Sequence, residues 1–342
     1  MTRQQVALIG AGMAVAPHVA SLGALAERVD VGWIVTQSGT RAAAIAERLR
    51  GARCSTSLDD VLSDDRITAA LVLTPPNTHL EIVTRLAGAR KHVLLEKPLE
   101  LDSRRAGQLV AVCAEAGVQL GVMLQHRLRP ASLAMKRLVQ GGALGEMTCA
   151  SVDMRWWRPQ SYYDQPGRGS RARDGGGVLL TQGIHTIDNF LQIAGLPSEL
   201  VAFAHTSPVH RMECEDVVAA ALRYANGATA TLNATVTAFP GFSERIEVCG
   251  TLATATLAGG QLEVHWHDGR HETIGQAQML GGGADPMAFT HEAHQAVIED
   301  FLDAIAQARE PAISGASVLP VQRLIDALLQ SAATRQVLDF GG

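Results

Sequence analysis

The sequence predicts an α/β fold of two domains: a doubly wound parallel sheet, then an α+β domain with a large, mostly antiparallel open sheet. Strand-like and helix-like runs alternate up to about residue 124. Beyond it, strand-like runs are joined by NG, GG and DG turns, which is typical of hairpins. The 342 residues also exceed what one core commonly holds. We therefore expect domains at 1–124 and 125–342, with closing helices that pack back on the first domain.

In the first domain the strand-like runs are QVALIG, VDVGWIV, ITAALVLT, KHVLLE and VQLGVML. Between them AAAIAERLR, HLEIVTRLAGA and SRRAGQLVAVCAEAG carry apolar residues at helical spacing. This alternation predicts parallel strands with right-handed crossovers.

In the second domain a helix, ASLAMKRLVQGG, precedes a strand-like run, MTCASVDMRWW, and an irregular stretch, SYYDQPGRGSRARDGGG. The strands VVAAALRYANGATATLNATVTAF and ERIEVCGTLATATLAGGQLEVHWHDG follow, and two helices close the chain.

Composition excludes several classes of protein. The net charge is 29 − 34 = −5, so we expect neither a nucleic-acid footprint nor a polybasic membrane patch. The apolar run in MTRQQVALIGAGM is too short for a transmembrane span and lacks the features of a signal peptide. We therefore expect a cytoplasmic protein.

Cysteine and histidine patterns do not predict a redox or metal site. The five cysteines are scattered and never at CxxC spacing, which predicts reduced, mostly buried side chains. The HEAH run at 291–294 spaces its histidines three apart rather than four, and VHWHDG alternates along a strand into a turn. We expect no metal.

The run ALIGAGMAV at 7–15 joins a buried strand to a helix through three small residues. Gly10 permits a tight turn, and Gly12 allows the backbone to approach a pyrophosphate at the helix N-terminus. Val15 occupies the third glycine position of GxGxxG, which weakens the match. The pattern still predicts a Rossmann dinucleotide site, with contacts from Gly10, Gly12, Met13 and Ala14.

The next strand ends in Thr36, Gln37 and Ser38, with Arg41 close behind. An NAD site commonly has an acid here, whereas hydroxyls and an arginine suit a 2′-phosphate. No acid occurs at 36–41, so NAD or NADP is expected with NADP slightly favoured; Arg41 as a solvated helix residue is the alternative.

Two further motifs follow strands at the edge where open α/β sheets bind ligands. We expect cofactor contacts from Thr74, Pro75, Pro76, Asn77, His79, Glu96, Lys97 and Pro98. A strand-end ammonium such as Lys97 can polarise a substrate oxygen or relay its proton, although alone it would be an ordinary surface lysine.

The stretch DGGGVLLTQGIHTID at 174–188 leaves two interpretations of His185: a satisfied core histidine, or a group that moves a proton. If 178–190 is a helix, Thr181, His185 and Asp188 share one face. Glycines 175–177 would then leave room for a ligand.

The motifs GAG, TPPNTH, LLEKPLE and GGGVLLTQGIHTID, in this order and spacing, resemble the Gfo/Idh/MocA family of nicotinamide-dependent sugar and cyclitol oxidoreductases. The resemblance runs through nearly the whole chain. It implies a Rossmann domain and a second domain whose open sheet forms the substrate site and often an oligomer interface. It also implies that Lys97 and His185 are catalytic and flank the reacting carbinol.

Thr181 departs from the pattern, because many relatives carry Asp there to orient and charge the histidine. Threonine brings no negative charge, so the imidazolium formed in alcohol oxidation is less stabilised unless Asp188 or another acid compensates. Our hypothesis is that the enzyme reduces ketones better than it oxidises alcohols, or has a more acidic histidine.

Substrate contacts are expected at the domain junction and in the irregular stretch, where aromatic faces, hydroxyls and arginines suit a polyhydroxylated ring or its carboxylate. The alternative is that many of these residues make surface or inter-subunit contacts. The candidates are Gln125, Arg127, Trp156, Arg158, Tyr163, Thr181, His185 and Asp188.

Together these observations predict an NAD(P)-dependent oxidoreductase that acts on a secondary alcohol or ketone of a sugar, sugar acid or cyclitol, as a homodimer or homotetramer. A cofactor-binding sensor without turnover is one alternative, favoured by Val15 and Thr181. A reductase of a non-carbohydrate carbonyl is another. A pure binder has no need of both Lys97 and His185.

Overall fold

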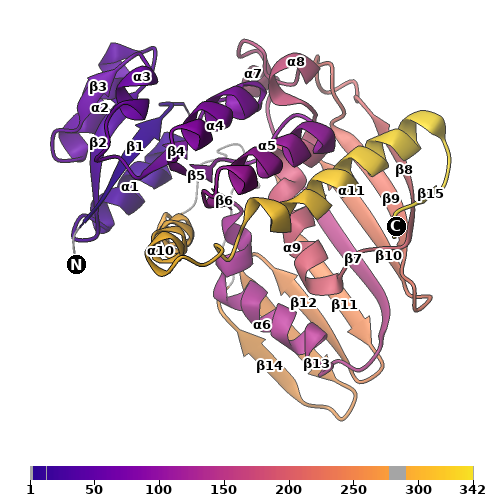
Figure 1. Cartoon of the computed structure of the whole chain (residues 1–342). Helices are drawn as coiled ribbons and strands as arrows, with labels where there is room; N and C mark the ends of the chain where they lie inside the picture. The colour runs from indigo at the N-terminus through magenta and orange to yellow at the C-terminus, as the bar shows by residue number, and fades with distance from the viewer. Residues whose placement is uncertain (1–2, 13, 277–289, 342) are drawn as a thin grey trace. The chain divides into compact units, whose positions relative to one another are not determined.

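The computed structural model describes residues 3–12, 14–276 and 290–341. The chain divides into two compact units (Figure 1). The first comprises Met1–Gln125 and Thr290–Leu319, and the second comprises His126–Phe289 and Pro320–Gly342.

The first unit is built on a six-stranded sheet with strand order β3-β2-β1-β4-β5-β6 and parallel pairing throughout. Strand order reverses between β1 and β4, which creates the switch point where such sheets bind ligands. The strands are β1 (Gln4–Ile9), β2 (Val29–Val35), β3 (Arg53–Ser55), β4 (Ala69–Val72), β5 (His92–Leu95) and β6 (Leu120–Val122). The helices are α1 (Val15–Ala24), α2 (Gly39–Arg48), α3 (Asp59–Leu62), η1 (Pro76–Thr78), α4 (His79–Gly88), α5 (Ser103–Glu115) and α10 (Glu292–Gln307).

All four residues of β4 are buried, as expected for a parallel strand covered on both faces. The closing helix α10 packs on α1 within this unit. None of the described helices is long and apolar enough to cross a membrane.

The second unit is built on a nine-stranded sheet of order β14-β13-β12-β11-β7-β10-β9-β8-β15, antiparallel except where β7 pairs with β10. The predicted fold class is confirmed. The strands are β7 (Met147–Arg155), β8 (Glu199–His205), β9 (Val217–Arg223), β10 (Thr229–Thr235), β11 (Arg245–Gly250), β12 (Ala253–Ala258), β13 (Gln261–Trp266), β14 (His271–Ile274) and β15 (Leu338–Asp339). Its helices are α6 (Pro130–Gln140), α7 (Gln160–Tyr163), α8 (Arg171–Asp174), η3 (Val178–Gly183) and α9 (Ile184–Ala194), while η2 (Gln125–Leu128) and α11 (Gly315–Thr334) have residues in both units' ranges.

Helices α6 and α9 pack on one face of this sheet, against β12, β13, β7 and β11. Burial accordingly alternates along a central strand such as β10, with one face in the core and the other exposed.

The expectation of a single α-helix over 178–190 is wrong in its first half. Residues Val178–Gly183 form a π-helix, and the α-helix begins at Ile184. Gly183 lies where the wider turn brings backbone close: a Cβ there would lie 3.0 Å from the Val178 carbonyl oxygen and 2.7 Å from Met154 Cε. Single π-turns inside helices are frequent at functional sites.

Candidate active site

The turn between β1 and α1 has the two glycine properties that a dinucleotide fingerprint requires. Gly10 has φ +101°, and an added Cβ would lie 2.8 Å from the backbone carbon of Leu73. At Gly12 an added Cβ would meet no described atom within 4 Å. The open backbone at Gly12 and the start of α1 fit a pyrophosphate. Ala14 is the half-buried N-cap of α1, while Met13 lies outside the described residues.

The end of β2 is neutral apart from one guanidinium. Arg41 Nη1 donates to the Ala11 carbonyl oxygen at 3.2 Å, so the arginine reaches back to the fingerprint turn. Gln37 Nε2 donates to the Thr56 carbonyl oxygen at 3.2 Å, and the Ser38 amide donates to Thr36 Oγ1 at 3.4 Å. This corner therefore carries positive charge close to the glycine turn.

His79, an expected cofactor contact, is fully buried. Its Nε2 lies 2.9 Å from the Thr74 carbonyl oxygen, and its Nδ1 lies 3.1 Å from the carbonyl oxygens of Pro98 and Leu99. The ring therefore holds the turn after β4 against the turn after β5.

Glu96, also an expected cofactor contact, is buried and hydrogen-bonded within the first unit. Its Oε1 lies 2.7 Å from His18 Nε2, and its Oε2 accepts a hydrogen bond from the Lys97 amide at 3.0 Å. Burial opposes ionisation, but His18 and the charges of Lys97 and His294 hold the pKa of the Glu96 carboxyl below its usual value. The residue braces the chain at Lys97. Thr74, Pro75, Pro76 and Lys97 are half-buried and Asn77 is exposed at this edge.

Two groups of potential metal ligands appear among the described residues, and each includes a histidine from a motif that we interpreted as non-metal. His18, Glu96 and His294 have ligand atoms within 4.8 Å of one another and lie in the first unit. The hydrogen bond between His18 and Glu96 accounts for the contact between these two side chains. Glu263, His265 and His271 form the second group, which is exposed on β13 and β14.

The glycine run before η3 is explained by Glu215 rather than by a ligand. The Gly177 amide donates to both carboxylate oxygens of Glu215 at 3.1 Å, and the Leu179 amide donates to Oε1 at 3.3 Å. A Cβ on Gly177 would lie 1.8 Å from the Glu215 carbonyl oxygen. The expected room for a ligand at this glycine is therefore wrong, because the backbone of Glu215 fills it. Burial raises the pKa of the Glu215 carboxyl, and these backbone donors oppose the shift.

His185 lies in the first turn of α9 and is half-buried. Its ring stacks on that of His126, with centroids 4.9 Å apart and planes 27° apart. Thr181 Oγ1 has two acceptors in reach: the Gly177 carbonyl oxygen at 2.7 Å and the amide oxygen of Gln182. Its single hydrogen goes to one of them, so toward any other group Thr181 can only accept.

Arg127 and Asp188 form a buried ion pair with each other. Arg127 Nε and Nη2 donate to the two carboxylate oxygens at 2.6 and 2.5 Å, and both side chains are at most 7% exposed. Burial raises the pKa of Asp188 and Arg127 opposes it. Arg127 and Asp188, which we expected to contact substrate, therefore bind each other, and the charge expected of Asp188 to compensate for Thr181 is paired with Arg127.

Arginines and aromatic rings gather between the end of β7 and α8. The Arg158 guanidinium lies 5.5 Å from the Trp156 ring and 6.0 Å from the Tyr162 ring, and that of Arg168 lies 4.8 Å from Tyr162. Trp156, Arg158 and Tyr163 are buried, as is Gln125 in η2. Burial raises the pKa of Tyr163, whose hydroxyl accepts a hydrogen bond from Gln182 Nε2 at 3.4 Å.

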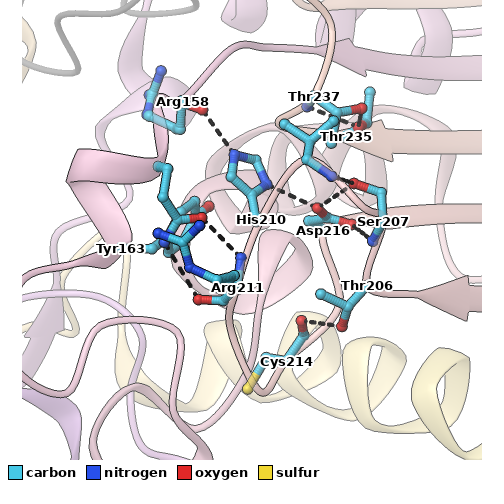
Figure 2. A network of polar contacts seen from close by, with 12 residues as sticks. Arg158, Tyr163, Thr206, Ser207, His210, Arg211, Cys214, Asp216, Thr235 and Thr237 are labelled. Carbon is cyan, nitrogen blue, oxygen red and sulfur yellow. Dashed lines mark hydrogen bonds and ion pairs between the residues drawn. The ribbon is translucent and has the colours of Figure 1, made fainter.

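A buried network that the sequence interpretation missed holds the backbone of Arg158 (Figure 2). His210 Nε2 lies 2.8 Å from the Arg158 carbonyl oxygen, and Nδ1 lies 2.8 Å from Asp216 Oδ2. Asp216 also accepts hydrogen bonds at 2.7 Å from the amide and the hydroxyl of Ser207. Both ring nitrogens of His210 therefore lie within hydrogen-bond distance of oxygen atoms. The only signal in the sequence was the ED dipeptide, Glu215-Asp216, before β9.

Known family descriptions match both units of the chain. The description "Oxidoreductase family, NAD-binding Rossmann fold" matches residues 4–124, and "GFO/IDH/MocA C-terminal domain" matches residues 132–256. The chain belongs to the Gfo/Idh/MocA family, as its motifs indicated.

Curated relatives include 1,5-anhydro-D-fructose reductase of Ensifer adhaerens, 31% identical over 58% of this chain and 59% of that enzyme. The chain thus matches about three-fifths of that relative's length. Inositol 2-dehydrogenase of Rhizobium meliloti is 26% identical over 87% of this chain and 88% of the relative. Among solved structures, the WlbA dehydrogenase of Bordetella pertussis, in complex with NADH and UDP-GlcNAcA, is 26% identical with a TM-score of 0.84 over 99% of both chains.

Proposed function

We propose that this oxidoreductase transfers hydride between a nicotinamide dinucleotide and a secondary alcohol or ketone of a sugar, sugar acid or cyclitol. The observation that carries the proposal is the fingerprint turn, where Gly10 packs against Leu73 and a Cβ on Gly12 would meet no atom of the described residues within 4 Å. A dinucleotide bound there supplies the hydride acceptor or donor. The relatives named for anhydrofructose, inositol and a UDP-sugar acid support the substrate class.

Lys97 and His185 are the residues to which we assign proton transfer. Lys97 follows β5 at the ligand-binding edge of the first sheet, and its backbone amide donates a hydrogen bond to the Glu96 carboxylate. His185 is half-buried and stacked, so its ring keeps one orientation while still reaching solvent. In the oxidative direction His185 accepts the hydroxyl proton or Lys97 relays it; in the reductive direction the proton returns to the oxygen.

The proposed preference for reduction follows from what surrounds Thr181. Its hydroxyl hydrogen is committed to Gly177 or Gln182, and Asp188 is neutralised by Arg127. Neither residue brings an unpaired negative charge to an imidazolium on His185, so the oxidation that creates this cation is the less favoured direction.

For the cofactor we propose NAD or NADP, with NADP favoured by the acid-free end of β2 and by Arg41. The test compares dissociation constants for both cofactors in the wild type and in Arg41→Ala. A 2′-phosphate contact predicts that the variant loses affinity for NADP and keeps that for NAD. Equal losses for both would assign Arg41 to supporting the fingerprint turn.

The arginine and aromatic group favours a substrate that carries a carboxylate or phosphate. The guanidiniums of Arg158 and Arg168 both lie within 6.0 Å of the Tyr162 ring, and guanidiniums bind carboxylates and phosphates well. A sugar acid would satisfy this requirement as well as the hydroxyl chemistry.

The deciding experiment follows reduced-nicotinamide fluorescence with NAD or NADP and a panel of polyols, aldoses, uronates and inositols, and with keto-sugars in reverse. Lys97→Ala and His185→Ala are measured alongside, with circular dichroism to show that they fold. Turnover abolished by both substitutions supports the proposal. Cofactor binding without turnover would favour the sensor, and turnover only of diketones or unsaturated rings would favour the non-carbohydrate reductase. We also propose a cytoplasmic homodimer or homotetramer, for which light scattering gives the mass.

A further inference from the structure

The nine-stranded sheet brings two of the five cysteines face to face. Cys149 on β7 is the direct cross-strand partner of Cys249 on β11. The neighbours Ala150 and Val248 are buried in the core, so both thiols lie on the opposite, outward face. Their meeting depends on register alone, since 249 − 149 = 100 residues separate them in the sequence. The expectation of mostly buried thiols is therefore wrong for this pair, in which Cys149 is exposed and Cys249 half-buried.

The geometry of direct cross-strand partners suits a disulfide. Opposed residues in antiparallel strands have Cα atoms roughly 4.5 to 5.5 Å apart, and disulfides span Cα separations of roughly 4.4 to 6.8 Å. Both thiols are free, with Cys149 exposed and Cys249 half-buried. Burial and the neighbouring Cys149 raise the pKa of the Cys249 thiol. Cys149 is thus the thiol that an oxidant in solution reaches first, and Cys249 is its direct cross-strand neighbour.

We propose that Cys149 and Cys249 are a redox-active pair that closes to an intrachain disulfide with a low-molecular-weight disulfide such as oxidised glutathione. The Cys149 thiolate attacks one sulfur of the oxidant, forming a mixed disulfide and releasing one glutathione thiolate. Cys249 then gives its proton to water and attacks Cys149 Sγ, forming the cross-strand bond and releasing the second glutathione thiolate. The protein dithiol loses two electrons and the oxidant gains two.

The test uses the full chain, reduced, freed of reductant and exposed to oxidised glutathione at about pH 8, where thiolate is present. Free thiols are then alkylated, and peptides are mapped by mass spectrometry without reduction. The wild type is expected to give a peptide linked through Cys149 and Cys249, with no glutathione retained on either. In Cys249→Ser the reaction is expected to stop with glutathione on Cys149.

Cys54→Ser is the matched control, because Cys54 is exposed and lies on β3 in the other unit. It is expected to leave the cross-link unchanged. Glutathione retained on Cys149 in the wild type would overturn the proposal, as would a covalent dimer through Cys149 on a non-reducing gel. The wild-type peptide map decides the matter even if a serine variant folds poorly, and it is independent of any catalytic role.

Discussion

The imidazole of His185 stacks on that of His126, with ring centroids 4.9 Å apart. His126 is buried and belongs to η2, so it presents a fixed surface against which one orientation of the His185 ring is preferred. A proton acceptor gains from such positioning, because misorientation of a catalytic group costs rate without changing its chemistry.

Replacing His126 is therefore expected to reduce kcat according to whether a ring remains. His126→Ala removes the stack, for which aromatic pairs are worth ~0.5–1.5 kcal/mol, so kcat should fall by about two- to tenfold. His126→Phe retains an aromatic face and should stay close to wild type. Steady-state kinetics on both variants checks this, and equal losses in the two would assign His126 a polar role instead.

The glycines at 12 and 177 should respond in opposite ways to alanine. A methyl at Gly177 collides with the Glu215 carbonyl. Gly177→Ala is therefore expected to lower the free energy of unfolding by more than the ~1 kcal/mol of an ordinary substitution, and to lower the melting temperature with it. A methyl at Gly12 would meet no atom of the described part of the chain within 4 Å, so Gly12→Ala should melt like wild type but bind NAD(P) more weakly.

Calorimetry and cofactor titration on these two variants separate stability from binding. Wild-type cofactor affinity in Gly12→Ala would contradict the assignment of the fingerprint turn.

Removing one charge of the Arg127–Asp188 ion pair should lower the free energy of unfolding more than removing both charges together. Asp188→Asn leaves a buried guanidinium without its counter-ion, and we expect a loss of roughly 3–5 kcal/mol in the free energy of unfolding. The double variant Arg127→Met with Asp188→Leu removes both charges and should recover much of that loss. Urea denaturation of the singles and the double gives the coupling, and additive losses would argue against a direct pair.

Acid stability should depend on Glu100, whose buried carboxylate accepts hydrogen bonds from Arg105 Nε and Nη2 at 2.9 and 2.8 Å and from the amides of Leu80 and Leu101. Burial raises the pKa, but these donors prevail and hold it below the ordinary value of 4.5. The folded state thus releases this proton more readily than the unfolded chain. The resulting stability is present above about pH 4.5 and is lost as the pH falls toward the lower folded pKa.

Glu100→Gln should accordingly be less stable than wild type at neutral pH and lose less stability between about pH 5 and pH 3. Glu115→Gln, an exposed glutamine substitution in α5, is the control. The measurement is the free energy of unfolding of both variants across this pH range. If the two variants showed the same pH slope, Glu100 would not be the source of this pH-dependent stability.

The sequence by itself determined the class of fold, the fingerprint turn and the family. These follow from local patterns: strand–helix alternation, a glycine that must adopt positive φ at position 10, and motifs such as EKP in a set order. Each is written within a few consecutive residues, where propensity and steric limits act directly.

Only the tertiary structure decided what each polar side chain faces. Asp188 pairs with Arg127, 61 residues away, and Glu215 occupies the space at Gly177 that seemed kept for a ligand. Cys149 meets Cys249 through strand register, and His79 turns inward to hold two turns together. Buried polar groups must find partners wherever the packed chain supplies them, and that choice is made by long-range packing rather than by the neighbours in the sequence.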